Sequence, residues 1–139
     1  MKIFSVTEAE VTLPLVRRIV QDLTQEYPRW RAAVADYEVL SAGARAGEGE
    51  PSDLSELHGT VMEHAELINA YLKELEQIGC VFKGFENGLV DFYALRDDRL
   101  VFLCWRLGED HITHWHEVDA GYAGREPIDE PLLFHDSSH

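Results

Sequence analysis

Most side chains that could bind a ligand or carry out chemistry lie in one stretch, residues 88–125. Its ionisable groups stand among Trp, Phe and Tyr residues, and they include Asp91, Cys104, Arg106, Glu109, His114, His116, Glu117 and Asp119. A pocket for a metal ion or a small molecule needs this mixture, because polar groups orient the ligand while apolar walls exclude water. A small sheet whose polar groups are all hydrogen-bonded has the same composition. The stretch therefore predicts the position of a site but not its reaction.

A metal centre is one chemistry that these residues could support. His114 and His116 are two residues apart, so both rings point to the same side of a β-strand. Imidazole nitrogens together with a carboxylate commonly hold zinc or another borderline metal ion. The candidate ligands of a divalent metal such as zinc are His114, His116, Glu117 and Asp91. The His-x-His-Glu spacing matches none of the specific zinc motifs, and histidines that are exposed or hydrogen-bonded without a metal are the alternative.

Two strands are expected to position Asp91 and Cys104. Residues 89–95 and 100–107 are rich in β-branched and aromatic side chains, which is typical of strands. A two-residue turn at 97–98 would place Asp91 directly opposite Cys104. Because side chains alternate between faces, one face is then entirely apolar and is expected to pack on helices; it carries Val90, Phe92, Ala94, Val101, Leu103 and Trp105.

The opposite, mixed face holds the candidate site, and the position of a third strand decides its composition. On this face Asp91 and Arg106 are diagonal neighbours within reach of an ion pair. A three-residue loop at 108–110 would add Ile112, His114 and His116 to the mixed face, and so would bring together an Asp, a thiol and two imidazoles. A loop of two or four residues would instead add His111, Thr113, Trp115 and Glu117.

The first part of the chain predicts a helical hairpin over residues 7–79 with a loop at about 41–52. Thr7 and Glu10 have the spacing of a capping box, in which each side chain satisfies a free backbone N–H group at the start of a helix. The loop segment, SAGARAGEGEP, contains no large apolar side chain, which is typical of an exposed connection. Gly79 is a natural residue for the end of the second helix.

Two prolines interrupt the first helix pattern. Pro14 is expected to begin the long helix after a short first turn, and Pro28 is expected to kink it rather than to end it. The apolar stripe continues on both helices, which are about twenty-five residues or longer and would expose a long seam. This seam predicts self-association through the hairpin, most simply as a homodimer.

The whole chain of 139 residues is expected to form a single α+β domain. In this interpretation the long antiparallel helical hairpin precedes a small three-stranded antiparallel β-meander at 80–120. Residues 121–139 are expected to form an extended acidic tail. We found no P-loop, dinucleotide-binding glycine motif, GxSxG elbow or HExxH motif, which disfavours the common cofactor enzymes.

Composition restricts the partners and the location. The formal net charge of −14 argues against binding to nucleic acid or to an anionic membrane surface. No apolar run is long enough to cross a membrane, and the first residues lack the apolar core of a signal peptide, so a cytoplasmic location is expected. Cys80 and Cys104 have no metal-binding or disulfide spacing and are expected to be buried thiols. A nucleophilic Cys104 beside a histidine is the alternative.

Several segments resemble a family of small prokaryotic proteins that is known only as domain of unknown function 2203. They are FSVTEA, LPLVRRIV, GCVFK, GLVDF, LCWRLGE and WHEVDAGYAGREPI, and the resemblance extends from Phe4 to Ile128. Such proteins commonly have an aromatic residue at the position of His114, which favours His116 with Glu117 over a site made of two histidines. The resemblance implies a fold and a prokaryotic origin but no activity.

Two functions are consistent with these observations. The first is a homodimeric ligand- or partner-binding module whose polar site on the meander is formed by Asp91, Arg106, Glu109, His116, Glu117 and Arg125. The second is a divalent-metal-dependent hydrolase-type enzyme. In it, His116 with Glu117 or Asp91 would hold the ion, another carboxylate would activate water, and Arg106 or Arg125 would stabilise developing negative charge.

Overall fold

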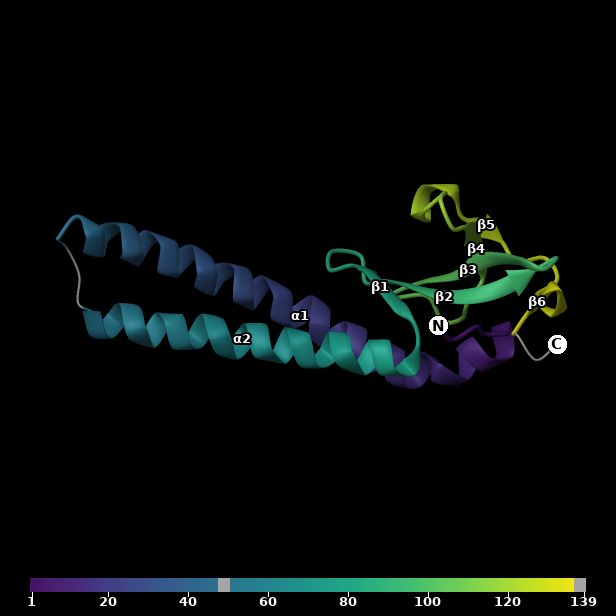
Figure 1. Cartoon of the computed structure of the whole chain (residues 1–139), viewed down its shortest axis with the longest axis horizontal. Coiled ribbons are helices and arrows are strands. Elements are labelled where there is room, and N and C mark those ends of the chain that lie inside the picture. The colour runs from purple at the N-terminus through teal and green to yellow at the C-terminus, as the bar shows by residue number, and fades with distance from the viewer. Residues whose placement is uncertain (48–50, 137–139) are drawn as a thin grey trace.

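The protein consists of a long helical hairpin packed against one antiparallel sheet (Figure 1). The computed structural model describes residues 1–47 and 51–136. Helix α1 spans Val6–Arg45 and helix α2 spans Pro51–Ile78. The first half of α1 and the end of α2 lie against the sheet, while the rest of the hairpin extends beyond it (Figure 1). The predicted α+β class and the helical hairpin are confirmed.

The cap of α1 lies two residues before the predicted one. The Ser5 hydroxyl accepts the Glu8 backbone N–H at 3.1 Å, and the Glu8 carboxylate accepts the Ser5 N–H at 3.0 Å. The predicted capping box at Thr7 and Glu10 is therefore wrong, although both pairs have the same spacing. Glu10 has another role, because its carboxylate accepts the backbone N–H of Ile112 at 2.7 Å and ties the connection before β4 to α1.

Helix α1 continues through both of its prolines. Pro14 does not mark the start of the long helix, because the Ser5 cap already initiates it. As predicted, the helix does not end at Pro28. Both proline side chains are exposed, so their rings do not disturb the packing of α1 on the core.

The connection between the helices begins later than predicted. The expected loop starts near Ser41, but α1 continues to Arg45 and α2 begins at Pro51. Residues 48–50, which belong to the expected loop, lie outside the described residues. At the other end of α2, Gly79 has a φ of +106°, a conformation that favours glycine, and its N–H donates to the Leu75 carbonyl at 3.1 Å.

Within the described residues the sheet has six strands rather than the three predicted. Strands β1 to β5 are neighbours in chain order, and β6 pairs with β2. The strands are β1 Val81–Gly84, β2 Leu89–Arg96, β3 Arg99–Arg106, β4 His114–Glu117, β5 Glu126–Pro127 and β6 Phe134–His135. The unpredicted strands β1, β5 and β6 have four, two and two residues, too few to show an alternating pattern.

The predicted pairing of the two long strands is confirmed. Asp91 lies opposite Cys104, and Leu89 lies opposite Arg106. The turn residues Asp97 and Asp98 have φ values of +52° and +59°, as a tight two-residue hairpin turn requires.

The predicted apolar face of β2 and β3 forms the centre of the core. Its six side chains are fully buried, and they pack against the buried stripe of α1 and against Trp115 of β4. The stripe of α1 consists of Ala9, Leu13, Val16, Ile19, Val20 and Leu23. Because the helices cover this face, the mixed face of the sheet points away from them.

The segment after β4 is not a plain extended tail. Residues 121–136 contain two single-turn 3₁₀ helices, η1 Tyr122–Gly124 and η2 Pro131–Leu133, in addition to β5 and β6. Phe134 is 2 % exposed and its ring centroid lies 5.5 Å from that of Trp115. The last predicted tail residues, 137–139, lie outside the described residues.

Candidate functional site

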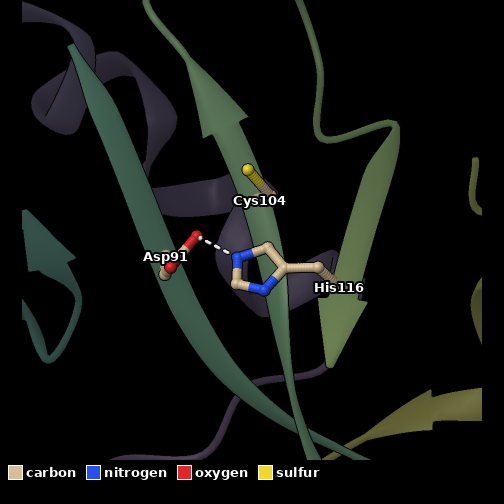
Figure 2. Close-up of side chains that lie close together, drawn as sticks. All are labelled: Asp91, Cys104 and His116. Carbon is tan, nitrogen blue, oxygen red and sulfur yellow. Dashed lines mark hydrogen bonds and ion pairs between the residues drawn. The ribbon is translucent and has the colours of Figure 1, made fainter. Parts of the chain in front are cut away.

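Three side chains from adjacent strands form a buried cluster on the mixed face (Figure 2). Asp91 comes from β2, Cys104 from β3 and His116 from β4. One carboxylate oxygen, the thiol sulfur and one imidazole nitrogen all lie within 4.8 Å of one another. The three residues are only 3 %, 1 % and 3 % exposed. Such donor atoms, converging in a buried place, have the arrangement of a metal centre.

The register of β4 brings His116 to this cluster. Cys104 pairs with His114 and Phe102 pairs with His116, which is the pairing that the predicted three-residue loop would give. The first of the two alternatives for the third strand is therefore confirmed for His114 and His116, whereas Ile112 lies in the hydrophobic core and not on the mixed face. The strand itself starts only at His114, and the Glu10 carboxylate holds the preceding connection at Ile112.

The two ring nitrogens of His116 have different partners. Nδ1 lies 2.7 Å from the Glu117 backbone carbonyl, and because a carbonyl only accepts, Nδ1 must carry a proton. Nε2 lies 3.1 Å from Oδ1 of Asp91 and points into the cluster. A single proton between Nε2 and Asp91 satisfies both groups, and a cation in place of this proton would also do so.

Burial raises the pKa of both acidic groups in the cluster. It raises the pKa of Asp91 above its ordinary value, although the neighbouring His116 and Lys83 oppose the shift. Burial, together with the Asp91 charge, also raises the pKa of Cys104 to about 12. Cys104 is therefore a neutral thiol at neutral pH, and its sulfur lies within 4.8 Å of the nearest carboxylate oxygen of Asp91.

The cluster lies at one side of a cavity of about 270 Å³. The other walls come from β1, from the start of β2 and from the segment after β4; they are Lys83, Leu89, Val118, Gly121 and Tyr122. The cavity thus has the three donors on one side, an ammonium group at its edge and apolar side chains around the rest.

Lys83 lines this cavity from a β-bulge in β1. The pairing of β1 with β2 shifts by one residue between Phe82 and Gly84, so Lys83 has no partner opposite it. Bulges change the direction of a side chain, and they are frequent beside functional sites. The Lys83 Nζ lies 3.9 Å from Oδ2 of Asp91 and 4.8 Å from the ring centroid of Phe102.

Two of the predicted metal ligands lie outside the cluster. Glu117 forms an ion pair with Arg99, with a shortest N–O distance of 2.6 Å, on the neighbouring strand. The Nδ1 of His114 contacts the Thr113 hydroxyl at 2.8 Å and lies 4.0 Å from Glu109. The predicted set of His114, His116, Glu117 and Asp91 is therefore not brought together. Only Asp91 and His116 meet, and Cys104 joins them.

The remaining candidates form a second group beside the cluster. Arg125 donates from one terminal nitrogen to both carboxylate oxygens of Glu109, at 2.9 and 3.1 Å. The Arg106 backbone N–H donates to the same carboxylate at 2.7 Å, while the Arg106 side chain is exposed. The predicted ion pair of Asp91 with Arg106 is wrong, because Asp91 is buried beside His116 and Lys83 instead.

Cys104 was not among the predicted metal ligands, and Lys83 was not predicted to lie beside the site. The predicted pairing of Asp91 with Cys104 already placed the thiol beside a carboxylate, but a Cys between Leu103 and Trp105 is also typical of a core. The position of Lys83 could not be predicted, because a four-residue strand with a bulge is too short to show an alternating pattern of side chains.

Fold and cluster together define an α+β protein in which a helical hairpin backs an antiparallel sheet with a buried Asp–Cys–His site. Residues 2–128 match the model of a family described as an uncharacterized conserved protein, DUF2203, and the chain belongs to this family. No curated protein and no solved structure matches the chain. Neither helix in the described part of the chain combines the length and the apolar composition needed to cross a membrane.

Proposed function

We propose that the protein is a ligand-binding module that holds a divalent metal ion, best fitted by zinc, at Asp91, Cys104 and His116. The observation that carries this proposal is the convergence of three different donor atoms within 4.8 Å in a buried place. Zinc accepts thiolate, imidazole and carboxylate ligands, whereas magnesium and calcium prefer oxygen donors alone.

The surroundings of His116 support the same proposal. Ligating histidines commonly donate their second ring N–H to a carbonyl or a carboxylate, which fixes the orientation of the ring. The Nδ1–H of His116 has this partner in the Glu117 carbonyl at 2.7 Å, and Nε2 faces the other two donors.

A role for Cys104 as a nucleophile has less support. A nucleophilic thiol needs a lowered pKa and a histidine that removes its proton. Here burial and Asp91 raise the pKa of Cys104 to about 12, and Nε2 of His116 is already engaged by Asp91. A metal ion can replace the protons of the thiol and of the Asp91–His116 pair together, since ligation deprotonates the thiol.

Metal content is the direct test of the proposal. Elemental analysis of the purified protein should find about one zinc per chain, and removal of zinc by a chelator should lower the thermal midpoint. In the cobalt-loaded protein, a sulfur-to-cobalt charge-transfer band should be present and should disappear in Cys104→Ser. His116→Ala should lose the metal, whereas His114→Ala, on the same strand but outside the cluster, should keep it. A metal-free preparation whose midpoint does not respond to zinc would refute the proposal.

Hydrolysis is a second candidate function, favoured by the cavity beside the three donors. Three protein ligands leave one position of a tetrahedral zinc for water, as in catalytic sites. The carboxylate base expected from the sequence has little support, because Glu109 is held by Arg125 and Glu117 by Arg99. Zinc-dependent cleavage of an activated ester, lost in His116→Ala, would support this activity; equal rates with and without zinc would exclude it for that substrate.

We also propose that the protein forms a homodimer through the hairpin. An apolar groove of about 490 Å³ lies between the two helices and the β1–β2 connection. It is lined by Tyr27, Trp30, Ala65, Ile68, Asn69, Leu72 and Phe85. A second copy is the simplest occupant, because the hairpin extends beyond the sheet (Figure 1) and the groove between its helices is apolar. The molar mass from light scattering tests this.

A cytoplasmic location and the absence of nucleic-acid partners belong to the same proposal. Both cysteines are free and buried, which fits a reducing compartment. The net charge of −14 would repel a polyanion.

A further inference from the structure

We propose that the second ligand of this site is a small aliphatic carboxylate, which binds the metal ion through its oxygen and pairs with Lys83. This inference rests on the proposed metal site and adds the chemical class of the molecule that would occupy the cavity.

The charges around the cavity favour an anion. The two positive charges of a divalent ion would be balanced by the Asp91 carboxylate and the Cys104 thiolate. The nearby Arg125 is neutralised by Glu109, which its guanidinium contacts at 2.9 Å. Lys83 then leaves one uncompensated positive charge at the edge of the cavity, and a monoanion would balance it.

Lys83 is available for such a ligand. Its Nζ is 3.9 Å from Oδ2 of Asp91, at the outer limit of an ion pair, and its side chain is 43 % exposed. When Asp91 shares its charge with a metal ion, its attraction for Lys83 decreases. The contact of Nζ with the Phe102 ring, 4.8 Å from the centroid, would keep the ammonium group beside the cavity.

The alternation of side chains along β1 directs Lys83 to the mixed face. Val81 pairs with Asp91, and Phe82 pairs with Val90 and packs against the core on the other face, so the next side chain, Lys83, returns to the side of Asp91. The bulge between Phe82 and Gly84 leaves Lys83 without a residue opposite it on β2.

The remaining walls explain why the anion should carry an apolar part. Leu89, Val118 and Tyr122 line the cavity beside the donors and Lys83. An inorganic anion would gain nothing from these side chains, whereas an alkyl chain would be removed from water. The cavity of about 270 Å³ restricts the ligand to a few carbon atoms.

The test is a titration of the full-length, cobalt-loaded protein, followed through the visible spectrum of the bound cobalt. Acetate and butyrate should change the spectrum until saturation, and butyrate should bind on the order of tenfold more tightly because two more methylene groups are buried. Acetamide has the shape of acetate without its charge, and it should bind at least about tenfold more weakly. Nitrate tests a monoanion that has no apolar part and should also bind weakly.

Variants of Lys83 show whether this lysine recognises the anion. Lys83→Gln should weaken butyrate binding about tenfold, while Lys83→Arg should retain most of it. Lys73→Gln removes the same charge from the exposed surface of α2 and should leave the affinity unchanged.

The outcomes separate this inference from the metal proposal. Cobalt binding without a spectral response to carboxylates would refute the inference and leave the metal site standing. Equal affinity for acetate and acetamide, tighter binding of nitrate than of butyrate, or an unchanged Lys83→Gln variant would also overturn it. Failure of cobalt to bind would refute both proposals.

Discussion

In the proposed metal site, a few atoms would exchange their protons for a metal ion. In the buried cluster Asp91 and His116 form a hydrogen bond with each other beside the Cys104 thiol, so these groups have partners without a metal. The same three groups would ligate a cation without leaving a polar atom unpaired. Metal binding and folding can therefore be tested separately with single substitutions.

Asp91→Asn is expected to remove metal binding but to keep the fold. The amide N–H can donate to Nε2 of His116, whose Nδ1–H already donates to the Glu117 carbonyl, so the free energy of unfolding should stay within about 1 kcal/mol of the wild type. Zinc affinity should fall at least about a hundredfold, because a neutral amide replaces a carboxylate ligand. Urea unfolding and calorimetric zinc titration measure the two effects. Glu117→Gln is the control and should keep the zinc affinity; a similar loss there would contradict the assigned ligands.

Cys80 should make the stability depend on pH in alkaline solution. Burial raises the pKa of this thiol from 9.0 to about 12, and its Sγ lies 3.5 Å from the Leu75 carbonyl. The folded state therefore keeps its proton when the unfolded chain loses it. The contribution to stability is complete below pH 9 and is lost as the pH rises towards 12.

The measurement is urea unfolding of the wild type and of Cys80→Ala at several pH values. Above about pH 9 the wild type should lose up to about 1.4 kcal/mol per pH unit more than the variant. Cys104 contributes equally to both proteins, so it cancels in the comparison. Parallel curves for the two proteins would contradict the prediction.

At the scale of elements, length decides what a sequence pattern can reveal. The eight-residue strands β2 and β3 and their turn were predicted with the right register, because eight residues show the alternation of faces clearly. The two-residue strands β5 and β6 exist only because a neighbouring strand offers free backbone groups. No local pattern precedes such pairing.

The position of the N-terminal cap of α1 can be tested with substitutions at Ser5 and at Thr7. Ser5→Ala should lower the free energy of unfolding by about 1 kcal/mol, because it removes the acceptor of the Glu8 N–H. Thr7→Ala is the matched control: Thr7 is exposed and lies within the first turn, so its effect should be within about 0.5 kcal/mol. Denaturant unfolding of both variants measures the difference. A larger loss for Thr7→Ala would favour the cap predicted from the sequence.

For the whole molecule, the extended hairpin is the feature on which the proposed dimer rests. In Figure 1 the two helices continue well past the sheet. The apolar groove is lined by residues of both helices and by Phe85. The length of the two helical patterns in the sequence already predicted self-association through the hairpin. The surface that would form the proposed dimer interface can be identified only in the folded chain.

Asn69→Arg is expected to convert the proposed dimer into a monomer. Asn69 lines the groove and is exposed, so a large charged side chain there would block a second copy without disturbing the core. Ala70→Arg adds the same charge one position along α2, outside the groove lining, and should leave the dimer intact. Light scattering of the wild type and both variants decides the question. A monomeric wild type, or a dimer that persists in Asn69→Arg, would rule out this interface.

Local sequence patterns were enough to predict the helical hairpin, the pairing of Asp91 with Cys104 and the apolar face of the long strands. These features follow from periodicities and turns that neighbouring residues encode. The tertiary structure alone shows which of the predicted site residues lie together. His116 reaches Asp91 because β4 adopts one of two possible registers. Lys83 reaches the cavity because β1 pairs with β2, and Glu117 forms an ion pair with Arg99. Each of these choices depends on contacts between distant segments, such as the bond from Glu10 to Ile112, which no local pattern specifies.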